Sequence, residues 1–358
     1  MRKRWIVLAG LGLLWIGLAA GLTTSVRAAG SAPSRPGTLV RLGGVEYVEA
    51  VEFGARFGLQ PQLRDAGRKL LLKSASTSIE LEADTRECSF NGLRAFLGNP
   101  VRIYKGSFVL GRIDADKFFA PILVPGAGEK NVPDLKVIML DPGHGGKDPG
   151  KENHRLGLNE KTLTLDTAFR LKKILEQAGY TVRMTRTEDR QLGPDKISDL
   201  QRRAELARAA GADLFISLHF NAVENGVDRV TGVEVYSLTP QYQYSTADPE
   251  HDDDRGAAEA NPGNTFDHWS TVLAYQVDRA MLRNLRTPDR GLKRARWAVL
   301  RYAACPAILI ESGFLSNNAE ARKLATAEYR QKIAEAIADG VQAYGNVLAG
   351  VRRQKIGR

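Results

Sequence analysis

Two histidines and two glutamates stand at chemically comparable places, each close to the end of a short apolar run or the start of a helix. His144 follows the run KVIML, His219 follows LFISL and Glu311 follows AILI. Glu160 comes directly after Asn159, a residue type that often begins helices. Two imidazoles and one carboxylate are a usual ligand set for catalytic zinc and leave the fourth coordination position for water. A second carboxylate nearby can move protons between that water and a leaving nitrogen. The spacing therefore indicates a zinc hydrolase.

Spacing alone leaves the choice of the carboxylate ligand open between Glu152 and Glu160. Glu152 is nearer to His144 in sequence, whereas Glu160 has a helix start to fix it and therefore ranks first. Asp141 and Asp148 are expected to orient the histidine ring or the loop around it. Glycines at positions 143, 145 and 146 allow a sharp turn there. The remaining histidines are expected to be structural: His154, His251 and His268.

The elements that must position these groups alternate between strands and helices. Apolar strands are predicted at 136–140, 181–185, 214–218, 232–238 and 307–310, and helices at 161–178, 200–210, 269–285 and through 333–344. Continuous apolar strands between helices predict an α/β fold, with a mostly parallel twisted sheet flanked by helices. Ligands of such sheets gather outside the carboxyl ends of the strands, so side chains that follow the strands can converge there.

A different pattern precedes this domain. Residues 38–123 contain short alternating runs such as SIELEA and SFVLG, which predict a small α+β module. Residues 124–134, with two prolines and two glycines, predict a linker, and residues 135–350 are expected to form the catalytic domain. Few contacts are expected across this linker, so a chain that begins near Asp134 should fold and act on small soluble substrates.

The first residues have the pattern of an export signal. Three basic residues precede the apolar run 5–22, and a small-residue cleavage pattern ends at Ala28, so residues 1–28 are predicted to be a signal peptide and residues 29–37 a linker. The run of 18 residues also reaches the minimum length of a membrane span, which leaves an uncleaved anchor as the alternative. Export to the periplasm or cell envelope is expected in either case, with membrane contact only if the segment is retained.

The net charge narrows the class of binding partner, and the two cysteines raise the question of a disulfide bond. The chain has a net charge of +10, and loss of residues 1–28 removes four basic residues and no acid, which leaves +6. This charge favours an anionic partner, and export excludes nucleic acid in favour of an acidic wall polymer. Cys88 and Cys305 could form a disulfide in an exported protein, but two buried free thiols are expected.

Four segments resemble, in order, the signature blocks of the zinc-dependent N-acetylmuramoyl-L-alanine amidases of the Amidase_3 type: LDPGHGGKDPG, NEKTLTLD, ADLFISLHFNA and PAILIESGFLSN. The resemblance covers roughly residues 136–348. It implies that His144, Glu160 and His219 hold Zn²⁺ and that Glu311 is the catalytic glutamate. It also implies hydrolysis of the amide between N-acetylmuramic acid and L-alanine of the peptidoglycan stem peptide. The alternatives are a noncatalytic peptidoglycan-binding protein that retains the fold and a zinc hydrolase that cuts within the stem peptide.

Two further segments bear on regulation and wall attachment. Some members of this family have a long helical insertion that plugs the active site until an activator removes it. Residues 239–268, with five prolines and glycines and an acidic cluster, predict a functional or mobile loop that is too short for such a helix. The sequence leaves open whether a cell-wall or divisome activator protein is a partner. Residues 38–123 resemble, more weakly, the copper amine oxidase N-terminal-like domain, but contain no histidine, so a wall-binding or spacer role is expected rather than copper.

Overall fold

The structure is a computed structural model that describes residues 39–129, 131–246 and 256–356. The predicted signal peptide and the linker that follows it, residues 1–37, lie outside the described residues. None of the helices within the described ranges combines the length and the apolar character that a membrane crossing requires.

A mostly parallel sheet lies at the centre of the C-terminal part. Six neighbouring strands follow the order β13-β10-β14-β17-β15-β16. They are β10 (Val137–Pro142), β13 (Thr181–Met184), β14 (Leu214–Asn221), β15 (Val233–Leu238), β16 (Asp289–Ala295) and β17 (Ala307–Phe314). Every neighbouring pair is parallel except β15 and β17, which are antiparallel. The predicted α/β fold is confirmed.

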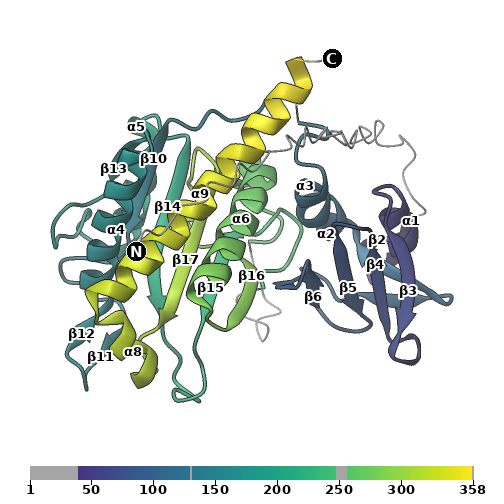
Figure 1. The fold of residues 1–358 in the computed structure, drawn as a ribbon, viewed down its shortest axis with the longest axis horizontal. Coiled ribbons are helices and arrows are strands. Elements are labelled where there is room, and N and C mark those ends of the chain that lie inside the picture. Colours follow the sequence, from purple (N-terminus) through teal and green to yellow (C-terminus); the bar gives the residue numbers. More distant parts are fainter. Residues whose placement is uncertain (1–38, 130, 247–255, 357–358) are drawn as a thin grey trace, which may run out of the picture. The chain divides into compact units, whose positions relative to one another are not determined.

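Helices cover both faces of this sheet. Figure 1 shows α4 (Glu160–Gln177), α9 (Ala327–Ile356) and α6 (Asp267–Leu285) in front of the strands. Their apolar stripes pack with one face of the sheet into the larger core. On the other face, α5 (Lys196–Ala209) and α7 (Ala298–Arg301) form a second apolar cluster with side chains of β14, β15 and β17. A short helix, α8 (Asn318–Leu324), follows β17.

The predicted helices are present with shifted ends. The helix expected from residue 200 begins at Lys196, because Asp195 and Ser198 form a capping box that satisfies the first backbone N–H groups. In residues 239–268, the described part contains only the 3-10 helix Pro262–Phe266 before α6 begins.

Residues 39–123 form a mainly β module. Its strands are β1 (Leu39–Leu42), β2 (Val45–Glu49), β3 (Gln60–Arg64), β4 (Lys69–Lys73), β5 (Ser78–Glu82), β6 (Glu87–Phe90), β7 (Leu93–Phe96), β8 (Arg102–Tyr104) and β9 (Ser107–Gly111). Its helical segments are α1 (Ala50–Ala55), α2 (Arg112–Asp114), the single π turn Ala115–Phe119 and α3 (Ala120–Leu123). One sheet has the order β1-β2-β9-β8, and strands β7 to β3 continue the central sheet beyond β16.

The expected lack of contacts between this module and the catalytic part is wrong. β7 pairs in parallel with β16, where Ala95 lies opposite Leu292, and Asp114 forms a buried ion pair with Arg294. The described residues of the module and of the catalytic part belong to the same compact unit. A segment rich in proline and glycine indicates only that the chain between two regions is irregular. It contains no information about the surface that the two regions bury against each other. The boundaries at 123 and 135 themselves stay predictions.

Candidate metal centre

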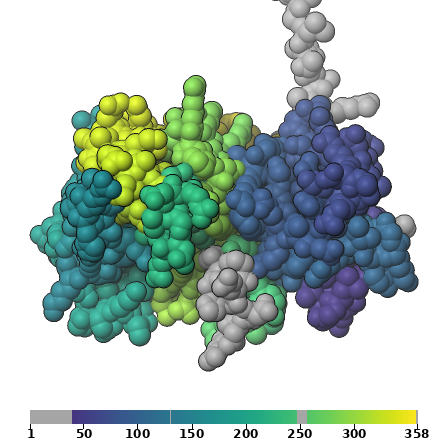
Figure 2. All heavy atoms as spheres, turned by 90° about the horizontal axis from the view of Figure 1, so that it is seen from below, coloured from purple at the N-terminus to yellow at the C-terminus, as the bar shows by residue number. Residues whose placement is uncertain are grey.

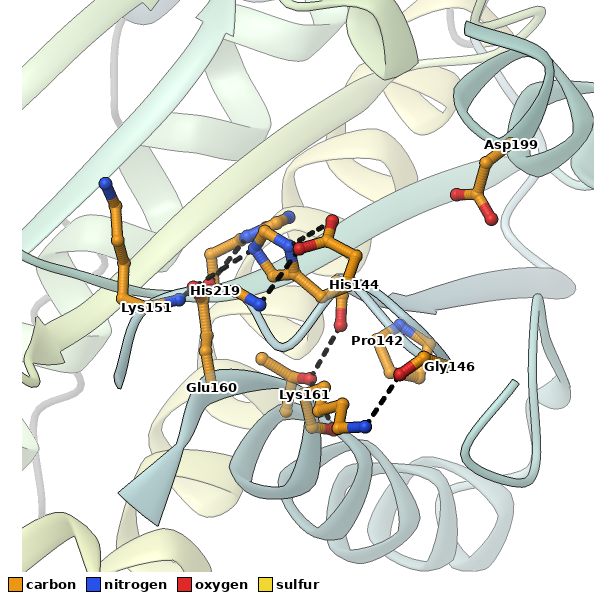
Figure 3. A network of polar contacts seen from close by, with 12 residues as sticks. Pro142, His144, Gly146, Lys151, Glu160, Lys161, Asp199 and His219 are labelled. Atoms are coloured by element: carbon orange, nitrogen blue, oxygen red, sulfur yellow. Dashed lines mark hydrogen bonds and ion pairs between the residues drawn. The ribbon is translucent and has the colours of Figure 1, made fainter. Parts of the chain in front are cut away.

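Three polar side chains from three elements converge at the edge where the parallel strands end (Figure 3). His144 lies in the turn after β10, Glu160 is the first residue of α4, and His219 lies in β14. One possible ligand atom from each residue lies within 4.8 Å of the other two. Figure 2 views the molecule from below, toward this edge, where the teal and green segments that follow β10 and β14 adjoin. The structure thus brings together the three residues that the sequence selects.

Glu160 is the centre of the cluster and is almost fully buried. Its Oε1 accepts a hydrogen bond from the backbone N–H of Phe220 (3.0 Å) and lies 2.8 Å from His219 Nδ1. Its Oε2 accepts from the backbone N–H of Lys151 (2.8 Å) and lies 3.0 Å from His144 Nε2. Burial raises the pKa of this carboxyl, but the two histidine rings outweigh burial and hold the pKa well below its usual value. Glu160 is therefore held as a carboxylate between the two rings.

The start of α4 determines where Glu160 points. Asn159 has an extended backbone, and its side-chain oxygen accepts from the backbone N–H of Thr162 (3.2 Å), so the helix begins at Glu160. Glu152, the rival carboxylate, is exposed on the short strand β11 (Glu152–Asn153) and does not belong to the cluster.

The turn that holds His144 is tightly constrained. His144 itself has a φ of 61°, a left-handed conformation that is uncommon outside glycine. Its Nδ1 lies 2.8 Å from Asp148 Oδ2, which leaves Nε2 directed at Glu160, as expected for a carboxylate that orients a ligand histidine. Gly143 is required by a close approach, because a Cβ there would lie 2.2 Å from His219 Cε1.

Asp141 stabilises this loop without touching a histidine ring. It is buried and accepts hydrogen bonds from Thr185 Oγ1 (2.6 Å), Ser217 Oγ (2.7 Å) and Arg203 Nη1 (2.8 Å). Burial raises the pKa of Asp141, but Arg203 and the two hydroxyls outweigh it, so the pKa is lowered. Arg203 also donates to the carbonyl oxygen of His144 (2.8 Å), which links Asp141 to the ligand turn.

A second buried arginine, Arg186, binds the same turn through carbonyl groups. It is 1% exposed and donates to the carbonyl oxygens of Pro142 (3.0 Å), Gly143 (2.9 Å) and Lys161 (2.7 Å). Burial, together with the charge of Arg203, lowers the pKa of Arg186 to about 10. The side chain thereby ties the turn after β10 to the first turn of α4, which joins two of the three cluster residues.

Sequence reasoning missed both arginines. A cation beside a strand end or on a helix normally indicates a solvated surface. For Arg203 a signal existed, since it lies one turn from Asp199 and Ala207 on the face of α5 that packs against the sheet. We find no comparable sequence signal for Arg186.

Glu311 lies in β17 directly opposite His219 in the strand register. Its side chain lines the same cavity as the cluster, and its Oε2 is buried with no hydrogen-bond partner among the described residues. Burial, followed by the negative charges of Glu160 and Glu234, raises the pKa of Glu311 well above its usual value. A buried carboxyl oxygen without a partner, facing a cavity, is available to a water molecule or a substrate.

A cavity of about 420 Å³ opens over these groups. His144, Glu160, His219 and Glu311 line one part of it. Other side chains in the wall include those of Gln191, Lys196 and Leu200 from the α5 region, Trp297 and Val299 at the start of α7, and Leu309 of β17. The cavity is large enough for an amide group with atoms on either side of the scissile bond.

The other residues singled out in the sequence lie elsewhere. His154 is exposed, and His268 Nε2 bonds to the carbonyl oxygen of Pro125. His251 lies outside the described residues. Cys88 and Cys305 are buried free thiols, as expected.

Comparison with known proteins agrees with this geometry. The sequence model of the N-acetylmuramoyl-L-alanine amidase family matches residues 138–343. AmiC of Neisseria meningitidis is 36% identical over 228 residues, which cover 59% of this chain and 53% of that protein. LytC of Bacillus subtilis is 34% identical over 209 residues, covering 58% of this chain and 35% of LytC. The chain thus spans between about a third and a half of these relatives. The solved structure of the amidase AmiC2 of Nostoc punctiforme is 33% identical, with 59% of this chain and 98% of that chain covered and a TM-score of 0.47.

Proposed function

Because the chain belongs to the N-acetylmuramoyl-L-alanine amidase family, we propose that it hydrolyses the amide between N-acetylmuramic acid and L-alanine of the peptidoglycan stem peptide. The products would be a lactyl carboxylate on the sugar and a free amino group on L-alanine. The observation that supports this proposal most strongly is the shared cavity, in which an imidazole–carboxylate–imidazole cluster faces a buried, unpartnered carboxyl of Glu311.

The residues of the cluster fit a zinc ion by their chemistry. Two neutral imidazoles and one carboxylate are a usual donor set for catalytic zinc, and Glu160, His144 and His219 supply it. Asp148 holds the outer nitrogen of His144, as carboxylates commonly do behind a ligand histidine. Bound Zn²⁺ would polarise the scissile carbonyl, lower the pKa of a water molecule and offset the negative charge of Glu160.

Glu311 would carry the proton in this proposal. Burial and then the charge of Glu160 raise the pKa of Glu311, and a cation held by the cluster would offset that charge and so favour the carboxylate form of Glu311. The carboxylate Oε2 would then accept a proton from the attacking water and return it to the nitrogen of L-alanine when the C–N bond breaks. Its register opposite His219 keeps it beside the cluster, and its burial excludes competing bulk water. The arginines Arg186 and Arg203 take no part in proton transfer and hold the ligand turn in place.

The proposal includes a place of action in the cell envelope and peptidoglycan as the partner. The signal pattern at residues 1–28 supports export to the periplasm or cell envelope, where peptidoglycan is present. A protein of Bacillus anthracis that is 31% identical to this chain over 217 residues is named an uncharacterized cell wall amidase, which agrees with that location. An activator protein stays a hypothesis.

A pair of substitutions tests the roles assigned to the site. Glu311→Gln preserves the size of the side chain but cannot accept the proton, so zinc content should stay at the wild-type level while turnover falls by about 10²- to 10⁴-fold. His219→Ala should lose zinc, measured by elemental analysis after dialysis, because it removes one of three ligands.

Glu152→Gln is the matched control, because Glu152 is a nearby glutamate that is exposed and outside the cluster. It should leave both zinc content and turnover unchanged. Wild-type turnover in Glu311→Gln would refute the assigned role of Glu311, and retained zinc in His219→Ala would refute the ligand set.

A further inference from the structure

We infer that the N-terminal module positions the wall of the active-site cavity that carries Trp297, through a buried contact centred on Arg294. The link itself is structural, whereas its effect on substrate binding rests on the proposed amidase function. The module would then be a working part of the catalytic unit, and its buried residues would be positioning residues for the reaction.

Arg294, on β16, is one of the residues through which the catalytic part contacts the module. It is 3% exposed and forms an ion pair with Asp114 of the module, which is fully buried. Asp114 also accepts hydrogen bonds from the backbone N–H groups of Gly98 (2.9 Å) and Asn99 (3.2 Å). Arg294 Nη2 further donates to the carbonyl oxygen of Phe96 (3.3 Å). The guanidinium is therefore fixed from the module side by both charge and geometry.

The same arginine holds the segment that follows β15, residues 239–246. Its Nη1 donates to Gln243 Oε1 (2.6 Å), and its backbone carbonyl accepts from the N–H of Thr246 (2.8 Å). Gln243 is buried against Gly98 of the module so closely that a Cβ at Gly98 would lie 2.0 Å from Gln243 Cγ. Arg86 of the module adds a hydrogen bond to the carbonyl oxygen of Ser245 (2.9 Å). The segment is thus bound to the module as well as to β16.

The segment 239–246 in turn is bound to the residue before Trp297. Arg296 Nη2 donates to the carbonyl oxygens of Pro240 (3.0 Å) and Gln243 (2.6 Å). Trp297 follows directly and is the residue before the first residue of α7. It lines the cavity and packs against Tyr236 with ring centroids 4.4 Å apart. Contacts therefore run without interruption from the module to the cavity wall.

The backbone of the segment indicates that these contacts impose its shape. Tyr242 has a φ of 63° although its side chain is 68% exposed and gains little from packing. A bulky residue keeps a left-handed conformation only when its surroundings enforce it. Here the neighbouring Gln243 is buried, and the N–H of Tyr242 donates to the carbonyl oxygen of Ala257 (2.6 Å). If the contacts of Gln243 with Arg294 and Gly98 are lost, residues 239–246 should change conformation. Arg296 should then move with them, because it is hydrogen-bonded to this segment.

Displacement of Trp297 should weaken substrate binding more than it slows the chemical step. Trp297 lines the cavity, whereas the cluster and Glu311 are positioned by β10, β14, β17 and α4. Loss of a wall contact that is equal in the ground and transition states raises KM and leaves kcat unchanged. A merely structural role of the module would lower thermal stability without such a split.

The test uses Gly98→Ala in the full-length chain, because the added methyl group must displace the side chain of Gln243. We expect KM for a soluble muropeptide to rise about three- to tenfold, with kcat and zinc content near the wild-type values. Hydrogen exchange should become faster in residues 239–246 and 296–302. In a Gln243→Ala background, the addition of Gly98→Ala should cause no further change, because the two act through the same contact.

Gly350→Ala is the matched control, since a Cβ there meets no atom within 4 Å, and it should change neither KM nor exchange in either segment. Should Gly98→Ala fail to fold, Arg86→Ala removes the bond to Ser245 without adding volume and should give the same pattern. Unchanged KM together with unchanged exchange at 296–302 would overturn the inference. If the wild-type protein does not cleave the muropeptide, the proposed function has failed, and the exchange at 296–302 still decides the structural link.

Discussion

Arg186 donates to several backbone carbonyl groups in and beside the metal-ligand turn, and also to the hydroxyl of Thr164. We predict that Arg186→Met lowers zinc affinity by about 10- to 100-fold, as loss of supporting contacts behind metal ligands typically does. Three of the carbonyl groups would each lose one of their donors, while Arg203 still binds that of Pro142 and Thr164 still binds those of Gly143 and Lys161. Stability should therefore fall by about 1–2 kcal/mol. Competition with a chelator measures the affinity.

The control is Arg183→Met, which removes an exposed arginine on the neighbouring strand β13. It should leave zinc affinity unchanged. Equal zinc affinity in Arg186→Met and the wild-type protein would show that the turn keeps its shape without this arginine.

Asp278, which is not part of the metal cluster, should make the stability of the protein depend on pH. It is fully buried on α6, and neither carboxyl oxygen has a hydrogen-bond partner among the described residues. Burial, followed by the charge of Asp289, raises its pKa well above the usual value. Above about pH 4 the unfolded state releases its proton before the folded state does, so Asp278 makes the protein less stable as pH rises.

The substitution Asp278→Asn replaces the carboxyl with an amide that does not ionise. It should therefore remove the loss of stability that occurs as pH rises. The variant should gain stability relative to the wild-type protein by up to about 1.4 kcal/mol for each pH unit above pH 4, until the folded acid ionises too. Thermal unfolding at pH 5 and pH 8 measures the difference. A difference between the two proteins that is the same at both pH values would contradict the raised pKa.

At the scale of single elements, the start of α4 fixes the central ligand. Asn159→Ala removes the cap and should cost about 1 kcal/mol of stability. Because Glu160 is the next residue, zinc affinity should fall as well, though less than in Arg186→Met, since the backbone N–H groups of Lys151 and Phe220 still hold the carboxylate.

Asn317→Ala is the corresponding control at the start of α8, a helix that supplies no residue to the cavity. It should cause a similar loss of stability with unchanged zinc affinity. If both variants lose zinc to the same extent, the start of α4 has no special role.

The elements that could be predicted from sequence are those with strong apolar patterns. β10, β14 and β17 are buried apolar strands, so the pattern placed His144 after β10 and His219 and Glu311 toward the carboxyl ends of β14 and β17, although both of these strands continue past those residues. β16 has the sequence DRGLKRA and could not be recognised, because its buried Arg294 is stabilised by Asp114, a partner 180 residues away. A local pattern contains no information about such a partner.

For the molecule as a whole, the sequence pattern predicted that the module and the catalytic part are separable, whereas both belong to one compact unit of the structure. A chain that begins at Asp134 would leave β16 as an open edge and Arg294 without Asp114. Loss of one partner of a buried ion pair costs about 3–5 kcal/mol, so its melting temperature should fall by about 10 °C or more. Differential scanning fluorimetry measures the change.

Removal of residues 1–37 alone is the control for this truncation, because it leaves the module and its ion pair intact. That shorter protein should melt at the wild-type temperature. If the chain that begins at Asp134 also melts at that temperature and retains its KM for small muropeptides, the two regions are independent after all.

Mass analysis of digested peptidoglycan shows whether this chain is, as we propose, a zinc-dependent amidase that cleaves the bond between N-acetylmuramic acid and L-alanine. Purified peptidoglycan is incubated with the protein, with the protein and a chelator, and with the chelated protein after addition of Zn²⁺. We predict stem peptides with new L-alanine amino termini and glycan strands with free lactyl carboxylates, lost with the chelator and restored by zinc. No release under any condition, or release of peptides with other amino termini, would contradict the account.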